Sequence, residues 1–261
     1  MTREEWDDHC AQVVNEMLEH VKKFSTPISK VIENDYGEHL GSGSFITDGG
    51  NIYLVTNEHV AKELNSKSLA HQFHDSDCVV RVMNPFCVKE YPIDVALTKI
   101  KEKAWSSCQH RSQPIPINRF SEKHDPIDGE LMFMIGYSDE RSRFNFGTLF
   151  SPGTPYLTQA VDFPSDLGKI EYHFSIHYKP DIAVSVDRST RGLPKPPGMS
   201  GSLVWNTRFV ECMHKQEAWT PEKSCITGIV WGWPSSDASL LATRVEHMML
   251  QDLLEAVNSI A

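Results

Sequence analysis

The chain has 261 residues, of which 40% are hydrophobic and 23% charged, a composition typical of folded globular proteins that excludes disordered and fibrous classes. Its 25 basic and 35 acidic side chains give a formal net charge of −10, and nucleic acid is not expected as a partner because phosphate binding depends on Lys and Arg. No apolar run approaches the roughly 20 residues of a membrane-spanning helix, so no membrane partner is expected.

The N-terminal sequence and the cysteines indicate a reducing compartment. Residues Met1–Glu5 lead into acidic, amphipathic sequence and lack the apolar segment of a secretory signal. The six cysteines are scattered, without a CxxC or other metal-ligand spacing. We therefore expect a cytoplasmic protein with reduced thiols, and a pairing of Cys212 with Cys225 stays open.

The first segment predicts an amphipathic helix. Thr2 and Glu5 fit a capping box, and Ser25-Thr26-Pro27 ends the pattern. We assign residues 1–35 to an N-terminal helical extension. Apolar residues recur at helical spacing, namely Trp6, Cys10, Val13, Val14, Met17, Val21 and Phe24.

From residue 36, short runs of β-forming residues alternate with turn residues, which is typical of antiparallel sandwiches and barrels. Residues 108–128 predict a connection between two β units, and an amphipathic pattern over Thr243–Asn258 predicts a C-terminal helix. The predicted strands are His39–Thr47, Ile52–Thr56, Cys78–Met83, Ile93–Ile100, Glu130–Gly136, Tyr172–Tyr178, Ile182–Val186, Ser202–Trp205 and Cys225–Trp231.

Three local sequences supply the parts that nucleophilic catalysis needs. His59 follows a predicted hairpin, Asp94 enters an apolar strand, and Ser200 stands in the run Gly198-Met199-Ser200-Gly201. Serine needs an adjacent base, and an imidazole oriented by a carboxylate suits that role. The N–H groups of Gly198 and Ser200 would form an oxyanion hole. The chain order His, Asp, Ser differs from the order Ser, Asp, His of α/β-hydrolases.

Five motifs carry a resemblance to a known family: Gly41–Ile46, Leu54–His59, Asp94–Leu97, Phe133–Tyr137 and Gly198–Gly201. Together they resemble the trypsin-like (chymotrypsin-fold) serine peptidases, most closely the bacterial, disulfide-free, Do-like branch, over about residues 36–245.

The resemblance implies an all-β fold of two antiparallel six-stranded β-barrels, with an N-terminal helical extension and a C-terminal helix. The first barrel would cover residues 36–120 and carry His59 and Asp94, while the second would cover 121–261, carry Ser200 and end in the helix. His59 would be the general base, Asp94 its orienting acid and Ser200 the nucleophile of a serine endopeptidase acting on proteins or peptides without a cofactor or metal.

Departures from the family concern specificity and activation. Met199 stands where secreted members carry the aspartate that pairs with a new N-terminus, so that maturation switch cannot operate. The substrate-binding strand reads Gly228-Ile-Val-Trp-Gly-Trp233, so we expect Trp231, Gly232 and Trp233 to contact substrate, with a place in the core as the alternative for the two tryptophans. Pro194 would lie at the floor of a specificity pocket that has no aspartate.

The sequence leaves a second function open, that of a catalytically unproductive protease-fold binding or scaffold protein, motivated by Trp231 and Met199. The apolar stripe of the N-terminal helix would pack on a barrel or receive a regulatory partner. Such a partner would act on the loop Pro194–Ser200, whose prolines and glycines allow two discrete states.

Two histidine clusters favour structural roles. His71 and His74 with Asp75 and Asp77 lie on a polar loop, where solvated side chains are expected and a metal site is not. His173 and His177 would share one face of a strand as satisfied or exposed histidines.

Overall fold

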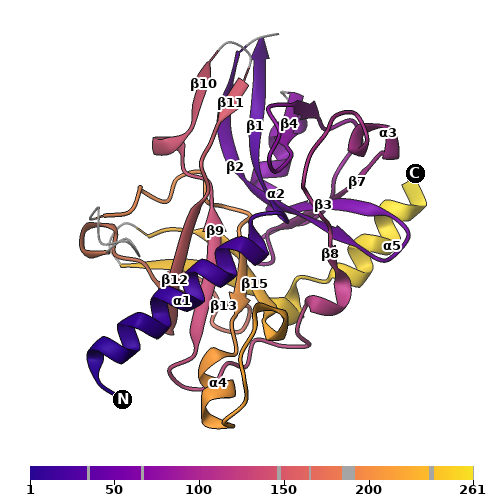
Figure 1. Ribbon diagram of the computed structural model, residues 1–261. Coiled ribbons are helices and arrows are strands. Elements are labelled where there is room, and N and C mark those ends of the chain that lie inside the picture. The colour runs from indigo at the N-terminus through magenta and orange to yellow at the C-terminus, as the bar shows by residue number, and fades with distance from the viewer. Residues whose placement is uncertain are drawn as a thin grey trace.

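The computed structural model describes the chain except residues 34–35, 66–67, 146–147, 165, 184–191, 235–237 and 261. Its strands form two units, with helix α1 and helix α5 at the two ends of the chain (Figure 1). The α-helices are α1 (Arg3–Val21), α2 (Glu58–Ala61), α3 (Glu102–Trp105), α4 (Phe209–His214) and α5 (Leu250–Ile260). Short 3₁₀ turns span Lys62–Asn65, Ile117–Arg119, Asp139–Arg141, Pro180–Ile182, Pro221–Lys223 and Val245–His247.

The N-terminal unit is an eight-stranded sheet in the order β5-β4-β1-β2-β3-β7-β6, with β8 paired to β2. The pairs are antiparallel except β2 with β8. Among the described residues the outer strands β5 and β6 do not pair, so the second closed barrel that the resemblance implied is not shown. Its strands are β1 (Ser25–Glu33), β2 (Tyr36–Thr47), β3 (Ile52–Thr56), β4 (Ser68–Gln72), β5 (Val79–Arg81), β6 (Cys87–Lys89), β7 (Val95–Ile100) and β8 (Ile115–Pro116).

The C-terminal unit is a closed barrel in the order β12-β13-β16-β15-β14-β9, which confirms a six-stranded barrel in this half of the chain. A separate hairpin, β10 with β11, stands beside it. The strands of this half are β9 (Leu131–Gly136), β10 (Arg143–Asn145), β11 (Thr148–Phe150), β12 (Thr154–Val161), β13 (His173–His177), β14 (Leu203–Asn206), β15 (Cys225–Gly232) and β16 (Ser239–Arg244).

The boundary of the N-terminal extension differs from the expectation. Helix α1 ends at Val21, and Ser25–Glu33 form β1, which lies between β2 and β4 in the first sheet. Pro27 is tolerated there because β1 pairs with β4 only from Ile28 onward, so the missing N–H faces no second strand. The helix therefore ends before the predicted Ser25-Thr26-Pro27 break, and that break lies inside a strand.

The C-terminal helix also begins later than expected. Residues up to Arg244 form β16, which pairs with β13 and β15 in the closed barrel. A 3₁₀ turn follows, and α5 starts at Leu250. Helix α5 packs on β6 and β7 of the first sheet, so the chain returns to its N-terminal unit at the end (Figure 1).

The described residues also bear on one expected strand and on the pairing of two cysteines. Part of the expected strand Ile182–Val186 is a 3₁₀ turn ending at Ile182, and residues 184–186 lie outside the described residues. Cys212 and Cys225, whose pairing the sequence left open, are both free thiols.

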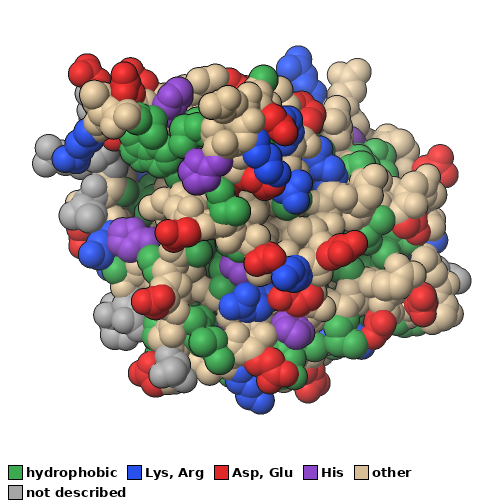
Figure 2. Space-filling view, turned by 90° about the horizontal axis from the view of Figure 1, so that it is seen from below, with side chains coloured by type: hydrophobic (Ala, Val, Ile, Leu, Met, Phe, Trp, Pro, Cys, Tyr) green, Lys and Arg blue, Asp and Glu red, His purple; other side chains and the backbone are tan. Residues whose placement is uncertain are grey.

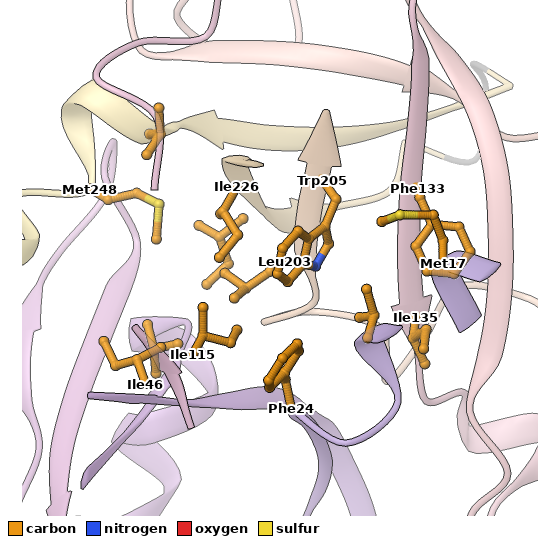
Figure 3. Packing of buried hydrophobic residues seen from close by; sticks show 14 of the residues in the cluster. Met17, Phe24, Ile46, Ile115, Phe133, Ile135, Leu203, Trp205, Ile226 and Met248 are labelled. Atoms are coloured by element: carbon orange, nitrogen blue, oxygen red, sulfur yellow. The ribbon is translucent and has the colours of Figure 1, made fainter. Parts of the chain in front are cut away.

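One hydrophobic cluster joins α1, the first sheet and the barrel. Met17 of α1 lies beside Phe133 and Ile135 of β9, and Trp205 of β14 faces Phe24 (Figure 3). The capping box at Thr2 and Glu5 forms as predicted. Because the two units share this core, the segments that carry His59 and Ser200 are held in one packed body.

The surface seen in Figure 2 mixes acidic and basic side chains over one face, without a broad basic field on that face. Among the residues that the structure describes, no helix combines the length and apolar character needed to cross a membrane.

Candidate active site

His59 and Asp94 form a two-point contact. The Asp94 carboxylate accepts the His59 backbone N–H through Oδ1 at 3.0 Å and lies 2.7 Å from His59 Nδ1 through Oδ2. Because a carboxylate accepts hydrogen bonds, this contact selects the tautomer of the neutral ring in which Nδ1 carries the proton and Nε2 has a free lone pair. The Asp94 side chain is 8% exposed and that of His59 is 37% exposed, so the acid is shielded while the ring reaches solvent.

The turn before β7 aims the Asp94 carboxylate. Asp94 has a φ of 51°, in the left-handed region that Asp tolerates better than most residues. Asn57, at the start of α2, donates its side-chain N–H to the Asp94 carbonyl at 2.7 Å. The short helix α2 and the Asp94 turn are thus joined by three hydrogen bonds that place His59.

The loop with Ser200 is seated against the first sheet. The Ser42 N–H donates to the Ser200 carbonyl at 2.7 Å, and the Gly201 N–H donates to Val230 of β15 at 2.9 Å. A Cβ at Gly41 would lie 2.8 Å from the Val60 side chain and 3.2 Å from the Ser200 carbonyl oxygen. Gly41 therefore lies close both to the residue after His59 and to Ser200.

The Ser200 hydroxyl lies 3.4 Å from the Trp231 carbonyl, its hydrogen-bond partner in this structure. No hydrogen bond joins it to His59, although both residues are described. Catalytic hydrogen bonds are often long or absent in free enzymes and tighten when substrate binds.

Two backbone donors beside Ser200 are unpaired among the described residues, the N–H groups of Gly198 and Ser200. The Pro197 carbonyl accepts from Asp139 N at 2.9 Å, so in the same planar peptide the Gly198 N–H points away from Asp139. Gly198 has a φ of 92°, a conformation that favours glycine.

Sequence reasoning missed the residues that hold the Gly198 carbonyl. Ser42 donates its hydroxyl to that oxygen at 3.0 Å and accepts Tyr137 N–H at 3.0 Å. His39 Nε2 lies 2.9 Å from the Tyr137 carbonyl and 3.3 Å from the Gly198 carbonyl. Burial lowers the pKa of His39, so the ring is neutral and donates from Nε2. The only available signal was the position of both residues within or beside Gly41–Ile46.

Met199 anchors the same loop in the barrel. Its side chain is 1% exposed and belongs to the barrel cluster that includes Met134 and Phe174. Burial of this apolar side chain holds the loop against the barrel.

The expected substrate-contacting residues divide between the end of β15 and the barrel core. Trp231 is half-buried at a register shift of β15, with its ring 4.8 Å from that of His173, while Gly232 ends the strand. Trp233 packs against the barrel cluster. Pro194 is buried, and its carbonyl accepts the Tyr178 hydroxyl at 2.7 Å.

A hollow of about 570 Å³ lies between the β2 strand and the β10–β11 hairpin, next to the Gly198 loop. It is lined by Tyr36, Gly37, Glu38, His39, Asp139, Ser142, Arg143, Phe144 and Leu149.

The remaining histidines lie in different environments. Across the described part of the chain, no group of three or more His, Cys, Asp or Glu side chains is arranged to hold a metal ion. His71 is buried against Phe45 and Phe73, and burial lowers its pKa to about 3. His173 is buried and fully hydrogen-bonded, whereas His177 is partly exposed.

Comparisons with known proteins add little. No family model and no curated protein matches the chain. One solved structure, described as "Aromatic interactions drive the coupled folding and binding of the intrinsically disordered Sesbania mosaic virus VPg protein", is similar at 13% identity and a TM-score of 0.45. The match covers 84% of this chain and 85% of that one. A similarity at this level says nothing about activity, so function rests on the site itself.

Proposed function

We propose that the chain is a serine endopeptidase with His59, Asp94 and Ser200 as its triad. The observation that carries the proposal is the two-point contact from Asp94 to His59, which fixes the tautomer with Nε2 unprotonated. Such a ring can accept a proton, and we propose that Ser200, whose loop is hydrogen-bonded to Ser42 of β2, supplies it.

The chemistry follows from these atoms. His59 Nε2 takes the Ser200 hydroxyl proton while Oγ bonds to the substrate carbonyl carbon, and the N–H groups of Gly198 and Ser200 donate to the oxyanion. His59 then passes the proton to the leaving amine, the C–N bond breaks and an acyl-enzyme remains. Water attacks the ester with His59 as base, and Ser200 recovers its proton as the acid product leaves.

The arrangement of the two β units is the second argument for a peptidase. We propose that the eight-stranded sheet is the counterpart of a first, His- and Asp-bearing barrel in a chymotrypsin-like fold, with the closed barrel as the second. The close approach of Gly41 to both Val60, the residue after His59, and the Ser200 carbonyl supports the proposal.

The substrate site is proposed to use the residues around the end of β15. The Trp231 carbonyl and Gly232 lie where an extended peptide would pair with the strand, and Trp233 follows them. Proteins or peptides are therefore the proposed substrates. We also propose that the enzyme is cytoplasmic and uses no cofactor.

The test is covalent labelling of the folded protein with a fluorophosphonate probe, located by peptide mass spectrometry. We expect one adduct, on Ser200, abolished in Ser200→Ala and retained in Ser107→Ala, which removes an exposed serine outside the site. Asp94→Asn should lower the labelling rate by about 10³- to 10⁴-fold.

One observation favours the alternative of an unproductive binding protein, namely that the Ser200 hydroxyl is paired with Trp231 and not with His59. Folded protein that gives no Ser200 adduct and cleaves no member of a peptide library would establish that alternative and reject the peptidase.

A further inference from the structure

The turn that carries Asp94 is held by the barrel of the other unit. His173 Nε2 donates to the Pro92 carbonyl at 2.7 Å, and the Thr243 hydroxyl donates to the Ile93 carbonyl at 2.8 Å. His173 of β13 and Thr243 of β16 are register partners, so their side chains project from the same face of the barrel wall. The neighbouring carbonyls of Pro92 and Ile93 therefore accept hydrogen bonds from two adjacent side chains of the barrel.

The hydrogen bonds of His173 determine its tautomer. The Lys169 N–H donates to Nδ1 at 3.0 Å, which makes Nδ1 an acceptor and leaves the ring proton on Nε2. The residue is 0% exposed, and burial lowers its pKa, so the ring is neutral. With both nitrogens engaged, His173 has no free atom for proton transfer and acts through the backbone that it holds.

The second carbonyl matters because of peptide geometry. The Ile93 carbonyl and the Asp94 N–H belong to one planar peptide unit, so anchoring that oxygen restricts the φ of Asp94. Asp94 has a φ of 51°, which a non-glycine residue keeps only when its surroundings impose it. The Thr243 hydroxyl donates directly to the carbonyl of this Ile93–Asp94 peptide, and Thr243 is 0% exposed.

We propose that His173 and Thr243 are positioning residues that hold the Asp94 carboxylate on His59. The proposal rests on the proposed function, since Asp94 matters only if His59 acts as a base. Under this proposal the barrel not only supplies Ser200 but also orients Asp94, which belongs to the first unit.

The experiment compares Thr243→Val with Thr243→Ser, because valine removes the hydroxyl at almost constant volume while serine keeps it. The matched control is Thr158→Val, which removes a buried hydroxyl of the same barrel that donates to His177 at 2.7 Å, away from the Asp94 turn. Readouts are the rate of Ser200 labelling, the melting temperature, and the low-field proton NMR signal of His59 Nδ1–H.

We expect Thr243→Val to lower the labelling rate by roughly 10- to 100-fold, the size of effect that small misplacements cause. It should also weaken or broaden the Nδ1–H signal, Thr243→Ser should restore both, and Thr158→Val should change stability alone. A second pair of variants tests the His173 ring. His173→Gln keeps a donor near the Nε2 position, so it should lower the Ser200 labelling rate less than His173→Asn does.

Equal labelling and an unchanged Nδ1–H signal in Thr243→Val and the wild type would overturn the proposal. So would a loss in Thr158→Val as large as that in Thr243→Val. If the wild type itself is not labelled, the peptidase proposal fails, whereas the NMR comparison still decides whether Thr243 holds Asp94 on His59. If Thr243→Val does not fold, the His173 pair supplies the same comparison.

Discussion

Gly201 and Ser42 lie backbone to backbone: a Cβ at Gly201 would overlap the Ser42 carbonyl oxygen and meet the Thr56 hydroxyl. Gly201 also has a φ of 94°. The residue after the nucleophile is therefore glycine for two reasons, one conformational and one steric, and the contact seats the Ser200 loop on β2.

Gly201→Ala should lower the free energy of unfolding by about 2–6 kcal/mol, from backbone strain plus the overlap. The matched control is Gly49→Ala, with a φ of 97° and no atom near the added Cβ, where strain alone should cost about 1–2 kcal/mol. Urea unfolding followed by tryptophan fluorescence measures both. A Gly201→Ala variant as stable as Gly49→Ala would show that the loop is not seated as described.

Met199→Ala should remove the apolar anchor of the nucleophile loop. We expect a loss of about 2–5 kcal/mol in unfolding free energy, as for other buried methionines, and a lower Ser200 labelling rate while the protein is still folded. Met134→Ala, in the same cluster, should cost similar stability with little change in labelling. Equal labelling in the two variants would mean that Met199 contributes to packing only.

His71 should make the protein acid-sensitive. Both ring nitrogens are buried without a hydrogen-bond partner among the described residues, and burial, with the neighbouring His110, lowers the pKa of His71 to about 3. The unfolded chain binds this proton near pH 6.5 and the folded chain does not, so stability is full above about pH 6.5 and falls toward pH 3. The slope from this one group is at most about 1.4 kcal/mol per pH unit.

The measurement is unfolding free energy between pH 7 and pH 4 for the wild type and His71→Leu. The variant should show a shallower slope, with a residual slope from His20 and His124, whose pKa values burial lowers to about 4. Exposed His214→Leu is the control. Parallel curves for wild type and His71→Leu would contradict this account.

Met17→Ala tests whether helix α1 only packs on the core or also restrains the candidate site. The side chain is 0% exposed in the common core, so we expect a loss of about 2–5 kcal/mol in unfolding free energy, measured by thermal and urea unfolding. Asn15→Ala, on the exposed face of α1, is the control. Labelling of Ser200 in the folded variant should be unchanged, because the apolar face of the helix is already covered. Raised labelling would instead mean that α1 restrains the site and that a partner could release it.

Local sequence patterns were sufficient for much of this protein. The period of the α1 stripe, the capping box at Thr2 and Glu5, and the strand predicted before His59 describe elements whose cause is local, and they formed as predicted. The three candidate catalytic residues could likewise be chosen from their flanking turns and strands. Propensity, capping and turn chemistry act over a few residues, so one sequence carries them.

Only the tertiary structure decided how those pieces meet. Pro27 signals the end of a helix, yet pairing with β2 and β4 makes its segment a strand, and β16 replaces the expected start of the last helix. The contacts that set the site join residues far apart in the chain, such as Ser42 with Gly198 and His173 with Pro92. Hydrogen bonds of this kind depend on how two units pack in space, and a polar residue on a strand looks the same in sequence whether it faces water or holds a distant carbonyl.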